Sequence, residues 1–307
     1  MRALLLLTAL LAQPLHHPKG EFIAVNGARL WVESEGTGEP LILIAGGPGF
    51  SHAYFHPFFS TLSNTHRVIY YDALGCGASE RPASPNDYTL ERAVEDLEGL
   101  RKALKLETLN ILGHSYGGFV AQDYALKHPR SVKRLILMGT FASGDLLQVL
   151  QDGYNYEVQH QLPEVWDKLT QLRAKGFKAA SKEHQEAYTI TPAFSYFYNP
   201  DNVAKLPLTD PNLYNPDPWF AMGGDDADFV VTGPLARWDV RKRLPEMKMP
   251  MLILGGRFDR QVPPNVTLSY KTLAPQAEFL MLEKSGHFPF IEEPDATFAA
   301  LRRFLAK

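Results

Sequence analysis

The motif Gly-x-Ser-x-Gly around Ser115 constrains this 307-residue chain more than any other feature. An apolar run, residues 109–112, leads into the motif, and a helix-compatible segment, residues 119–127, follows it. A strand, a sharp turn and a helix in this order hold the central residue in a strained conformation. Gly113 and Gly117 tolerate that turn because they bring no Cβ against the neighbouring backbone. The pattern predicts a Ser115 hydroxyl exposed at the carboxyl end of a strand.

Two later positions supply the groups that would activate such a hydroxyl. A serine becomes a strong nucleophile when a histidine takes its proton and a carboxylate orients that histidine. Asp259 follows the apolar run 251–254, and His287 follows the apolar run 279–282. Each residue could instead be an ordinary turn residue or helix cap. The shared order and strand context favour a triad of Ser115, Asp259 and His287, because parallel strands bring their carboxyl ends to one sheet edge.

A glycine-rich loop, residues 45–49, follows the apolar run 41–44. Its glycines let the backbone approach a substrate closely, and its proline fixes the turn. We assign an oxyanion hole to the backbone N–H groups of Gly47 and Tyr116, the residue after Ser115. The alternative, a phosphate-binding loop, is disfavoured because neither Gly-Lys-Ser/Thr nor a full Gly-x-Gly-x-x-Gly occurs here.

The order of these signals predicts an α/β-hydrolase fold, with a mostly parallel central sheet and an inserted, mainly helical cap. Residues 21–140 and 237–307 alternate between strand and helix patterns and are assigned to the core. Asn26-Gly27 predicts an opening hairpin, so the sheet should begin with antiparallel strands. Residues 141–236 show no convincing buried strand and are assigned to a cap over the strand ends.

Composition restricts the kinds of partner. The net charge is -3, and the 31 basic residues form no cluster, which argues against nucleic acid. With 1 cysteine, Cys76, the chain forms no intramolecular disulfide and no cysteine cluster for zinc. Attack by an activated serine needs no metal, and we expect no cofactor. The expected partner is a small-molecule or short-peptide substrate.

The N-terminus resembles a secretory signal. Arg2 precedes an apolar segment, residues 3–12, that ends in Ala12 as a candidate cleavage residue. The segment is shorter than the roughly 20 apolar residues that a membrane-spanning helix needs. We therefore exclude residues 1–20 from the fold and expect a secreted or periplasmic protein. The alternative is a cytoplasmic protein whose N-terminal segment packs on the core.

The motifs together resemble the proline iminopeptidase family of α/β-hydrolases. The resemblance is carried by residues 45–49, 71–79 and 113–118 and by the segments around Asp259 and His287. It implies an enzyme that releases an N-terminal residue, often proline, from a peptide or amide. The family places an acid directly before a Phe-x-x-Thr-Gly segment to hold the substrate's ammonium group. In this chain that segment is residues 229–233, and the acid is Asp228.

Two departures from the family pattern keep other functions open. Ala45 stands where the family usually has histidine, and Arg260 stands where a second acid often follows the catalytic aspartate. A guanidinium at that place would repel a cationic N-terminus and suit a carboxylate or a neutral, polarised substrate. The alternatives are therefore an esterase, lactonase or carbon–carbon bond hydrolase with the same triad. A further alternative is a non-catalytic binding protein on this fold.

Overall fold

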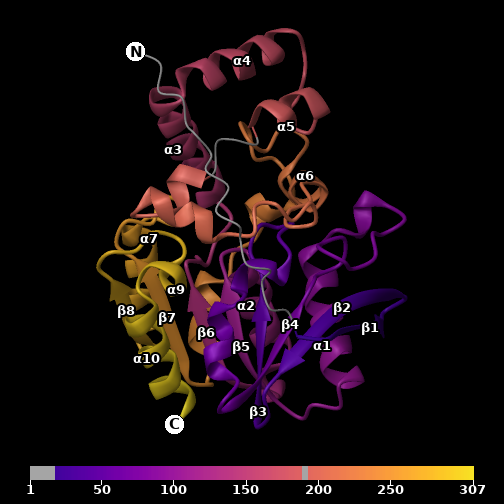
Figure 1. The fold of residues 1–307 in the computed structure, drawn as a ribbon, viewed down its shortest axis with the longest axis vertical. Helices are drawn as coiled ribbons and strands as arrows, with labels where there is room; N and C mark the ends of the chain where they lie inside the picture. The colour runs from indigo at the N-terminus through magenta and orange to yellow at the C-terminus, as the bar shows by residue number, and fades with distance from the viewer. Residues whose placement is uncertain (1–17, 189–192) are drawn as a thin grey trace.

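A single mixed sheet forms the centre of the molecule, and the computed structural model describes residues 18–188 and 193–307. The strands are β1 (Gly20–Val25), β2 (Ala28–Glu35), β3 (Glu39–Ile44), β4 (His66–Tyr71), β5 (Leu109–His114), β6 (Val132–Met138), β7 (Met251–Gly256) and β8 (Glu278–Leu282). They form an 8-stranded sheet in the order β1-β2-β4-β3-β5-β6-β7-β8 (Figure 1). β2 pairs antiparallel with β1 and β4, and every later pair is parallel. The predicted mostly parallel sheet is confirmed.

Helices follow most of the strands. Those outside the β6–β7 connection are α1 (Leu90–Ala103), α2 (Gly117–Lys127), α7 (Pro264–Leu268), α8 (Tyr270–Leu273), α9 (Pro289–Glu292) and α10 (Pro294–Leu305). Those between β6 and β7 are α3 (Leu146–Gln161), α4 (Pro163–Ala174), α5 (Lys182–Tyr188) and α6 (Asp217–Gly223). Short 3-10 helices are η1 (His52–Phe55), η2 (Phe58–Leu62), η3 (Pro85–Asp87), η4 (Pro129–Ser131), η5 (Ala193–Tyr196), η6 (Pro200–Lys205), η7 (Pro234–Arg237) and η8 (Arg241–Glu246).

The central strands contain continuous apolar runs because both sheet faces are covered. In β3, Ile42 and Ile44 belong to a core shared with α1, α2 and α8, while Leu41 and Leu43 belong to a core shared with η1, η2 and α10. Successive side chains of a strand point to opposite faces, so each face needs its own apolar partner. This double burial explains why the sequence shows apolar runs here and not alternation.

The local signals at the edges behave as the sequence predicts. Asn26 and Gly27, with φ of 48° and 83°, form the turn between β1 and β2. Both positive φ values suit the tight hairpin turns that Asn-Gly favours. The antiparallel start of the sheet is therefore fixed by local turn chemistry.

The connection between β6 and β7 is helical in its described part. Helices α3, α4, α5 and α6 lie together at one end of the molecule, beyond the sheet (Figure 1). Between Met138 and Met251, the residues that the structure describes contain no β-strand. This agrees with the helical character expected for residues 141–236, while the division into core and cap at those residues stays a prediction.

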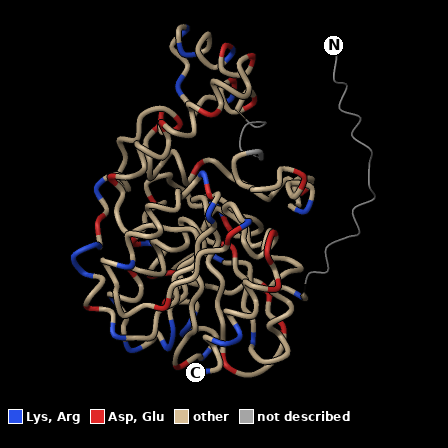
Figure 2. The backbone as a smooth tube through the Cα atoms, turned by 90° about the vertical axis from the view of Figure 1, so that its left-hand side faces the viewer, with Lys and Arg blue, Asp and Glu red and all other residues tan. Residues whose placement is uncertain are grey.

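The charged residues are mixed in sign over the molecule. Figure 2 shows basic and acidic positions interspersed along the tube at both the sheet end and the helical end. None of the helices in the described ranges is both long and apolar enough to cross a membrane. The predicted secretory signal falls on residues 1–17 and lies outside the described part of the chain.

Candidate active site

Ser115 occupies the turn between β5 and α2 in a left-handed conformation, with φ of 55°. The flanking glycines are required by close backbone contacts. A Cβ on Gly113 would lie 2.4 Å from the Gly117 carbonyl oxygen, and a Cβ on Gly117 would lie 2.2 Å from the Ile44 carbonyl oxygen. A positive φ is costly for a residue with a side chain and persists where the surroundings impose it. The Gly-x-Ser-x-Gly pattern therefore follows from the crowding of strand and helix at this turn.

His287 and Asp259 form a buried pair at the ends of the last two strands. The Nδ1 atom of His287 lies 2.8 Å from Oδ2 of Asp259, and both residues are 3% exposed. Oδ1 of Asp259 accepts the backbone N–H groups of Gln261 and Val262, each at 2.8 Å. A carboxylate held in this way accepts from Nδ1–H of His287, which leaves Nε2 as the basic nitrogen.

Backbone contacts bring this pair to the turn that carries Ser115. The Ser115 N–H donates to the Met138 carbonyl at 2.9 Å, at the end of β6. The next residue, Gly139, lies so close to the pair that a Cβ there would be 3.2 Å from Nδ1 of His287 and 3.5 Å from Oδ2 of Asp259. Asp259 and His287 therefore contact each other beside Gly139, and the Ser115 backbone bonds to the residue before Gly139, at the carboxyl edge of the parallel strands.

The glycine loop lies directly against the turn that carries Ser115. A Cβ on Gly46 would be 2.9 Å from Cβ and 3.4 Å from Oγ of Ser115. Gly47 has φ of 114°, a conformation that glycine adopts without strain. Gly47, Ser115 and Tyr116 line the same cavity. The two N–H groups assigned to an oxyanion hole therefore belong to residues beside the nucleophile.

This cavity has a volume of about 790 Å³ and lies between the sheet edge and the helical connection. Aromatic side chains from the helical part line it, among them Tyr154, Tyr188 and Trp219. The described lining residues include two carboxylates, Asp210 and Asp228, and among them there is no lysine, arginine or histidine. An apolar, water-poor wall strengthens the electrostatic influence of any carboxylate within it.

Asp228 is the buried carboxylate of the lining, with 5% exposure. Its Oδ1 accepts the Trp219 indole N–H at 2.9 Å, and its Oδ2 accepts the Gln185 amide at 3.1 Å. Burial raises the pKa of Asp228 to about 6, against the lowering effect of these two hydrogen bonds. These two hydrogen bonds orient the side chain. A cation that enters the cavity would stabilise the buried carboxylate.

The neighbouring acids of the same segment have partners elsewhere. The two carboxylate oxygens of Asp226 accept hydrogen bonds from the two terminal nitrogens of Arg173, at 2.5 and 2.9 Å. Asp225 pairs with Lys178 at 2.6 Å, and both side chains are more than half exposed. Asp228 is the member of this acidic group that lines the cavity.

Arg260 points away from the lining residues. Its guanidinium lies 3.7 Å from a carboxylate oxygen of Glu157 on α3, its side chain is 46% exposed, and it is not among the residues that line the cavity. The sequence placed Arg260 beside the catalytic aspartate along the chain. Neighbours in sequence point in different directions at a loop, so proximity to Asp259 does not bring the guanidinium to the substrate.

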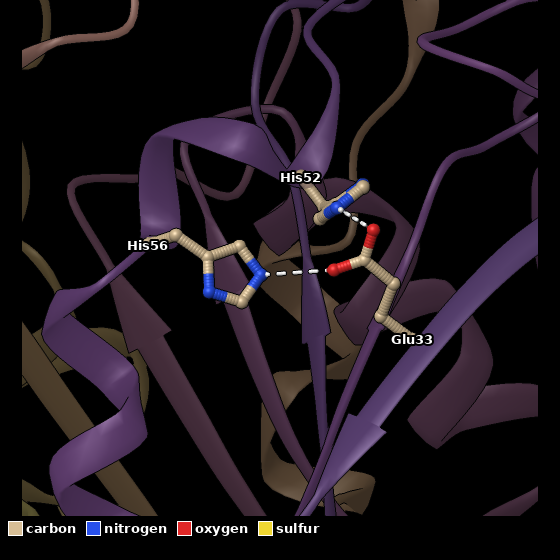
Figure 3. A group of neighbouring side chains, drawn as sticks. All are labelled: Glu33, His52 and His56. Carbon is tan, nitrogen blue, oxygen red and sulfur yellow. Dashed lines mark ion pairs between the residues drawn. The ribbon is translucent and has the colours of Figure 1, made fainter. Parts of the chain in front are cut away.

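Sequence reasoning missed a buried cluster of Glu33, His52 and His56 (Figure 3). Glu33 lies 3.2 Å from Nε2 of His52 and 3.3 Å from Nε2 of His56. On its other side His52 contacts Asp72, with 2.8 Å between Nδ1 and Oδ1. Burial opposes a charge on His52, but Asp72 and Glu33 outweigh it and raise the pKa of His52 to about 9.

The cluster is explained as an ion network that links β2 to η1 and the residue after it. Its three ligand-type side chains lie within 4.8 Å of one another, which is close enough for a metal ion. Structural zinc sites use four protein ligands, however, and catalytic ones add water at an open position. Here a His52 imidazolium between the Glu33 and Asp72 carboxylates already offsets one of their two negative charges. No sequence motif predicts this cluster, because Glu33 lies on β2 whereas His52 lies on η1 and His56 directly follows η1.

Comparisons with known proteins identify the fold and the family. Residues 39–294 match the family model of the alpha/beta hydrolase fold. A proline iminopeptidase of Heyndrickxia coagulans is 34% identical over 292 residues, covering 92% of this chain and 97% of the relative. One of Clostridium botulinum is 30% identical over 282 residues, covering 91% and 94% of the two chains.

Among solved structures, the fold is similar to that of a proline iminopeptidase from Mycobacterium smegmatis. The TM-score is 0.72 at 22% identity, with 94% of this chain and 98% of that chain covered. This chain is therefore a hydrolase that belongs to the proline iminopeptidase family of the α/β-hydrolase fold.

Proposed function

We propose that this protein is a serine aminopeptidase that releases an N-terminal proline, or another small apolar residue, from short peptides and amides. The observation that carries the proposal is the placement of Asp228, a buried carboxylate in the wall of the cavity that Ser115 also lines. A buried carboxylate gains most from a cation that it can pair with directly. The free ammonium group of a peptide N-terminus is such a cation.

The proposed chemistry is acyl transfer in two steps. His287 takes the proton of Ser115 through Nε2 while Oγ attacks the substrate carbonyl, and Asp259 stabilises the imidazolium that forms. The N–H groups of Gly47 and Tyr116 hold the oxyanion. His287 then gives the proton to the leaving amine, which departs as the acyl-enzyme forms. In the second step His287 activates water, which releases the amino acid and restores Ser115.

Recognition of the substrate follows from the same cavity. The ammonium group pairs with Asp228, and the aromatic wall around Trp219 and Tyr188 encloses the apolar side chain. An N-blocked substrate would bury the Asp228 carboxylate without a charged partner, so the cavity selects against it. Arg260 takes no part in this recognition, because its guanidinium is half exposed beside Glu157 and outside the lining.

A comparison of three chromogenic substrates tests the proposal. We expect proline nitroanilide to be cleaved with a kcat/KM at least roughly 100-fold above that of N-acetylproline nitroanilide, because only the first pairs with Asp228. A short acyl nitrophenyl ester measures the intrinsic reactivity of Ser115. Cleavage of the ester alone would overturn the aminopeptidase assignment in favour of an esterase with the same triad. Failure of a fluorophosphonate to label Ser115 would favour a binding protein.

The preference for a free amine is expected to depend on pH. Since the pKa of Asp228 is about 6, its carboxylate is lost as the pH falls through that value, and the pairing with the ammonium is lost with it. At the upper end the substrate amine itself loses its proton near pH 8, roughly the value of an α-amino group. The kcat/KM ratio of the free to the blocked substrate should therefore be largest between about pH 6 and pH 8.

The ratio is the useful measurement because any change in the shared acyl-transfer groups affects both substrates alike. Values of kcat/KM report the pKa values of the free enzyme, so the acid limb should fall near the pKa of Asp228. A ratio that stays constant from about pH 5 to pH 7 would contradict an ionised Asp228 as the ammonium site.

A further inference from the structure

A continuous chain of hydrogen bonds connects the glycine loop to the loop of His287. The Gly46 N–H donates to the Tyr54 hydroxyl oxygen at 2.7 Å, and that hydroxyl lies 2.9 Å from Nδ1 of His114. Nε2 of His114 lies 2.9 Å from the carbonyl oxygen of His287. The chain therefore passes from Gly46 to His287 through the residue that directly precedes Ser115.

The chemistry of its two ends fixes the direction of every bond in the chain. A carbonyl oxygen only accepts, so Nε2 of His114 carries the proton that it donates to His287. In a neutral ring Nδ1 is then bare and accepts from the Tyr54 O–H. The Tyr54 oxygen in turn accepts from the Gly46 N–H, which can only donate. One tautomer of His114 and one rotamer of the Tyr54 hydroxyl satisfy all three bonds.

The surroundings keep the His114 ring neutral and immobile. His114 is 1% exposed and Tyr54 is 2% exposed. Burial, and secondly the charge that His287 can carry, hold the pKa of His114 well below its usual range. The rings of His114 and His287 are 4.7 Å apart between centroids, and the ring of Phe288 packs 5.2 Å from that of His114. Little water can replace a bond removed from this chain.

We propose that Tyr54 and His114 are positioning residues, which set the spacing between the oxyanion loop, Ser115 and the base His287. The proposal rests on the triad of the proposed function. Gly46 precedes the oxyanion donor Gly47, and a Cβ on Gly46 would lie 2.9 Å from that of Ser115. An error of about 1 Å in the placement of reacting groups costs on the order of 100-fold in rate.

The Tyr54 ring also packs in the core, so the test must separate loss of the hydroxyl from loss of core packing. Tyr54→Phe keeps the ring and removes the hydroxyl, which leaves the Gly46 N–H and Nδ1 of His114 without their partners. Tyr270→Phe is the matched control. Tyr270 is 1% exposed, and its hydroxyl donates one hydrogen bond to Gln122 at 2.9 Å, away from the cavity lining.

The test compares kcat and KM of both variants, on whichever chromogenic substrate the wild-type protein cleaves. For Tyr54→Phe we expect kcat to fall about 10- to 100-fold while KM changes less than about threefold, because the ring that lines the cavity is kept and the lost hydroxyl bonds only to Gly46 and His114. For Tyr270→Phe we expect a lowered melting temperature with kcat unchanged. A kcat of Tyr54→Phe within about twofold of wild type would overturn the proposal.

A second variant keeps the test valid if Tyr54→Phe folds poorly. His114→Gln offers one acceptor and one donor in place of Nδ1 and Nε2, and it should retain more activity than His114→Phe, which offers neither. The double variant Tyr54→Phe/His114→Gln should be no slower than the slower single variant, because both changes break the same chain. Fully multiplicative losses in kcat would mean that Tyr54 and His114 act independently and would overturn the proposal.

The rate of fluorophosphonate labelling at Ser115 separates this inference from the substrate assignment. The reaction uses the nucleophile, the base and the oxyanion hole and requires no ammonium group. Slower labelling of Tyr54→Phe, in a protein that cleaves only the ester, would support the positioning role while the aminopeptidase assignment fails. Unchanged labelling, in a protein that prefers the free amine, would overturn the positioning role alone.

Discussion

Replacement of Ser115 by alanine is expected to lower kcat by about 10⁴- to 10⁶-fold on every substrate that the protein cleaves. The hydroxyl oxygen is the only heavy atom removed, and it is the atom that forms the acyl-enzyme. Without it His287 and Asp259 have no nucleophile to activate, so only the oxyanion hole and binding accelerate the reaction. Steady-state kinetics, together with the loss of a nitrophenol burst, measure the effect.

The fold should survive this substitution. Alanine keeps the Cβ that packs against Gly46, and the Ser115 N–H still donates to the Met138 carbonyl. Ser269→Ala is a suitable control, since it removes a hydroxyl that bonds to the Val266 carbonyl, outside the cavity lining. A Ser115→Ala protein that keeps roughly a tenth of the wild-type activity would contradict the triad. A fluorophosphonate adduct on another residue would then identify the true nucleophile.

The three candidate triad positions could be identified from the sequence because each of them follows an apolar run. Ser115, Asp259 and His287 are far apart along the chain, but parallel pairing sends every strand end to one edge. Glycine spacing around Ser115 added a second local signal. The sheet topology alone therefore places these three strand ends at one edge, and no knowledge of side-chain packing is needed to predict this.

The supporting contacts around the site could not be predicted in this way. Glu33 and His52 meet because β2 and η1 pack together, and polar residues on such elements are normally exposed. The contact between Tyr54 and His114 likewise depends on how η1 packs on the end of β5. These contacts have no spacing rule, because they depend on rotamers and on the depth at which elements pack.

Asp228 and Arg260 show the limit of a family resemblance used residue by residue. The resemblance pointed to Asp228, and the residue lies in the cavity lining with Ser115. Arg260 follows Asp259 in the sequence and was expected to repel a cationic substrate, yet its guanidinium pairs with Glu157 on α3. The direction of the Arg260 side chain depends on how α3 packs, and the sequence pattern does not predict that packing.

Removal of the Asp228 carboxylate is expected to cost about 3–5 kcal/mol in transition-state binding of free-amine substrates, which is roughly a 200- to 5,000-fold loss of kcat/KM. The reason is that the substrate ammonium would be buried without its counter-charge. Asp228→Ala removes the carboxylate entirely. Asp228→Asn keeps an oxygen for the Trp219 N–H but removes the charge, and it should lose nearly as much.

Asp225→Asn is the matched control for Asp228→Asn. It makes the same change of charge three positions earlier, but Asp225 pairs with Lys178 at the surface, where an ion pair contributes at most about 1 kcal/mol. The Asp228 variants should cleave N-acetylproline nitroanilide and the nitrophenyl ester no more slowly than the wild type, because neither substrate carries an ammonium that needs the carboxylate. Equal losses on free and blocked substrates would show that Asp228 supports the cavity wall through Trp219 and Gln185. A loss confined to the free amine requires a charge-to-charge contact, since a distorted wall would slow all three substrates.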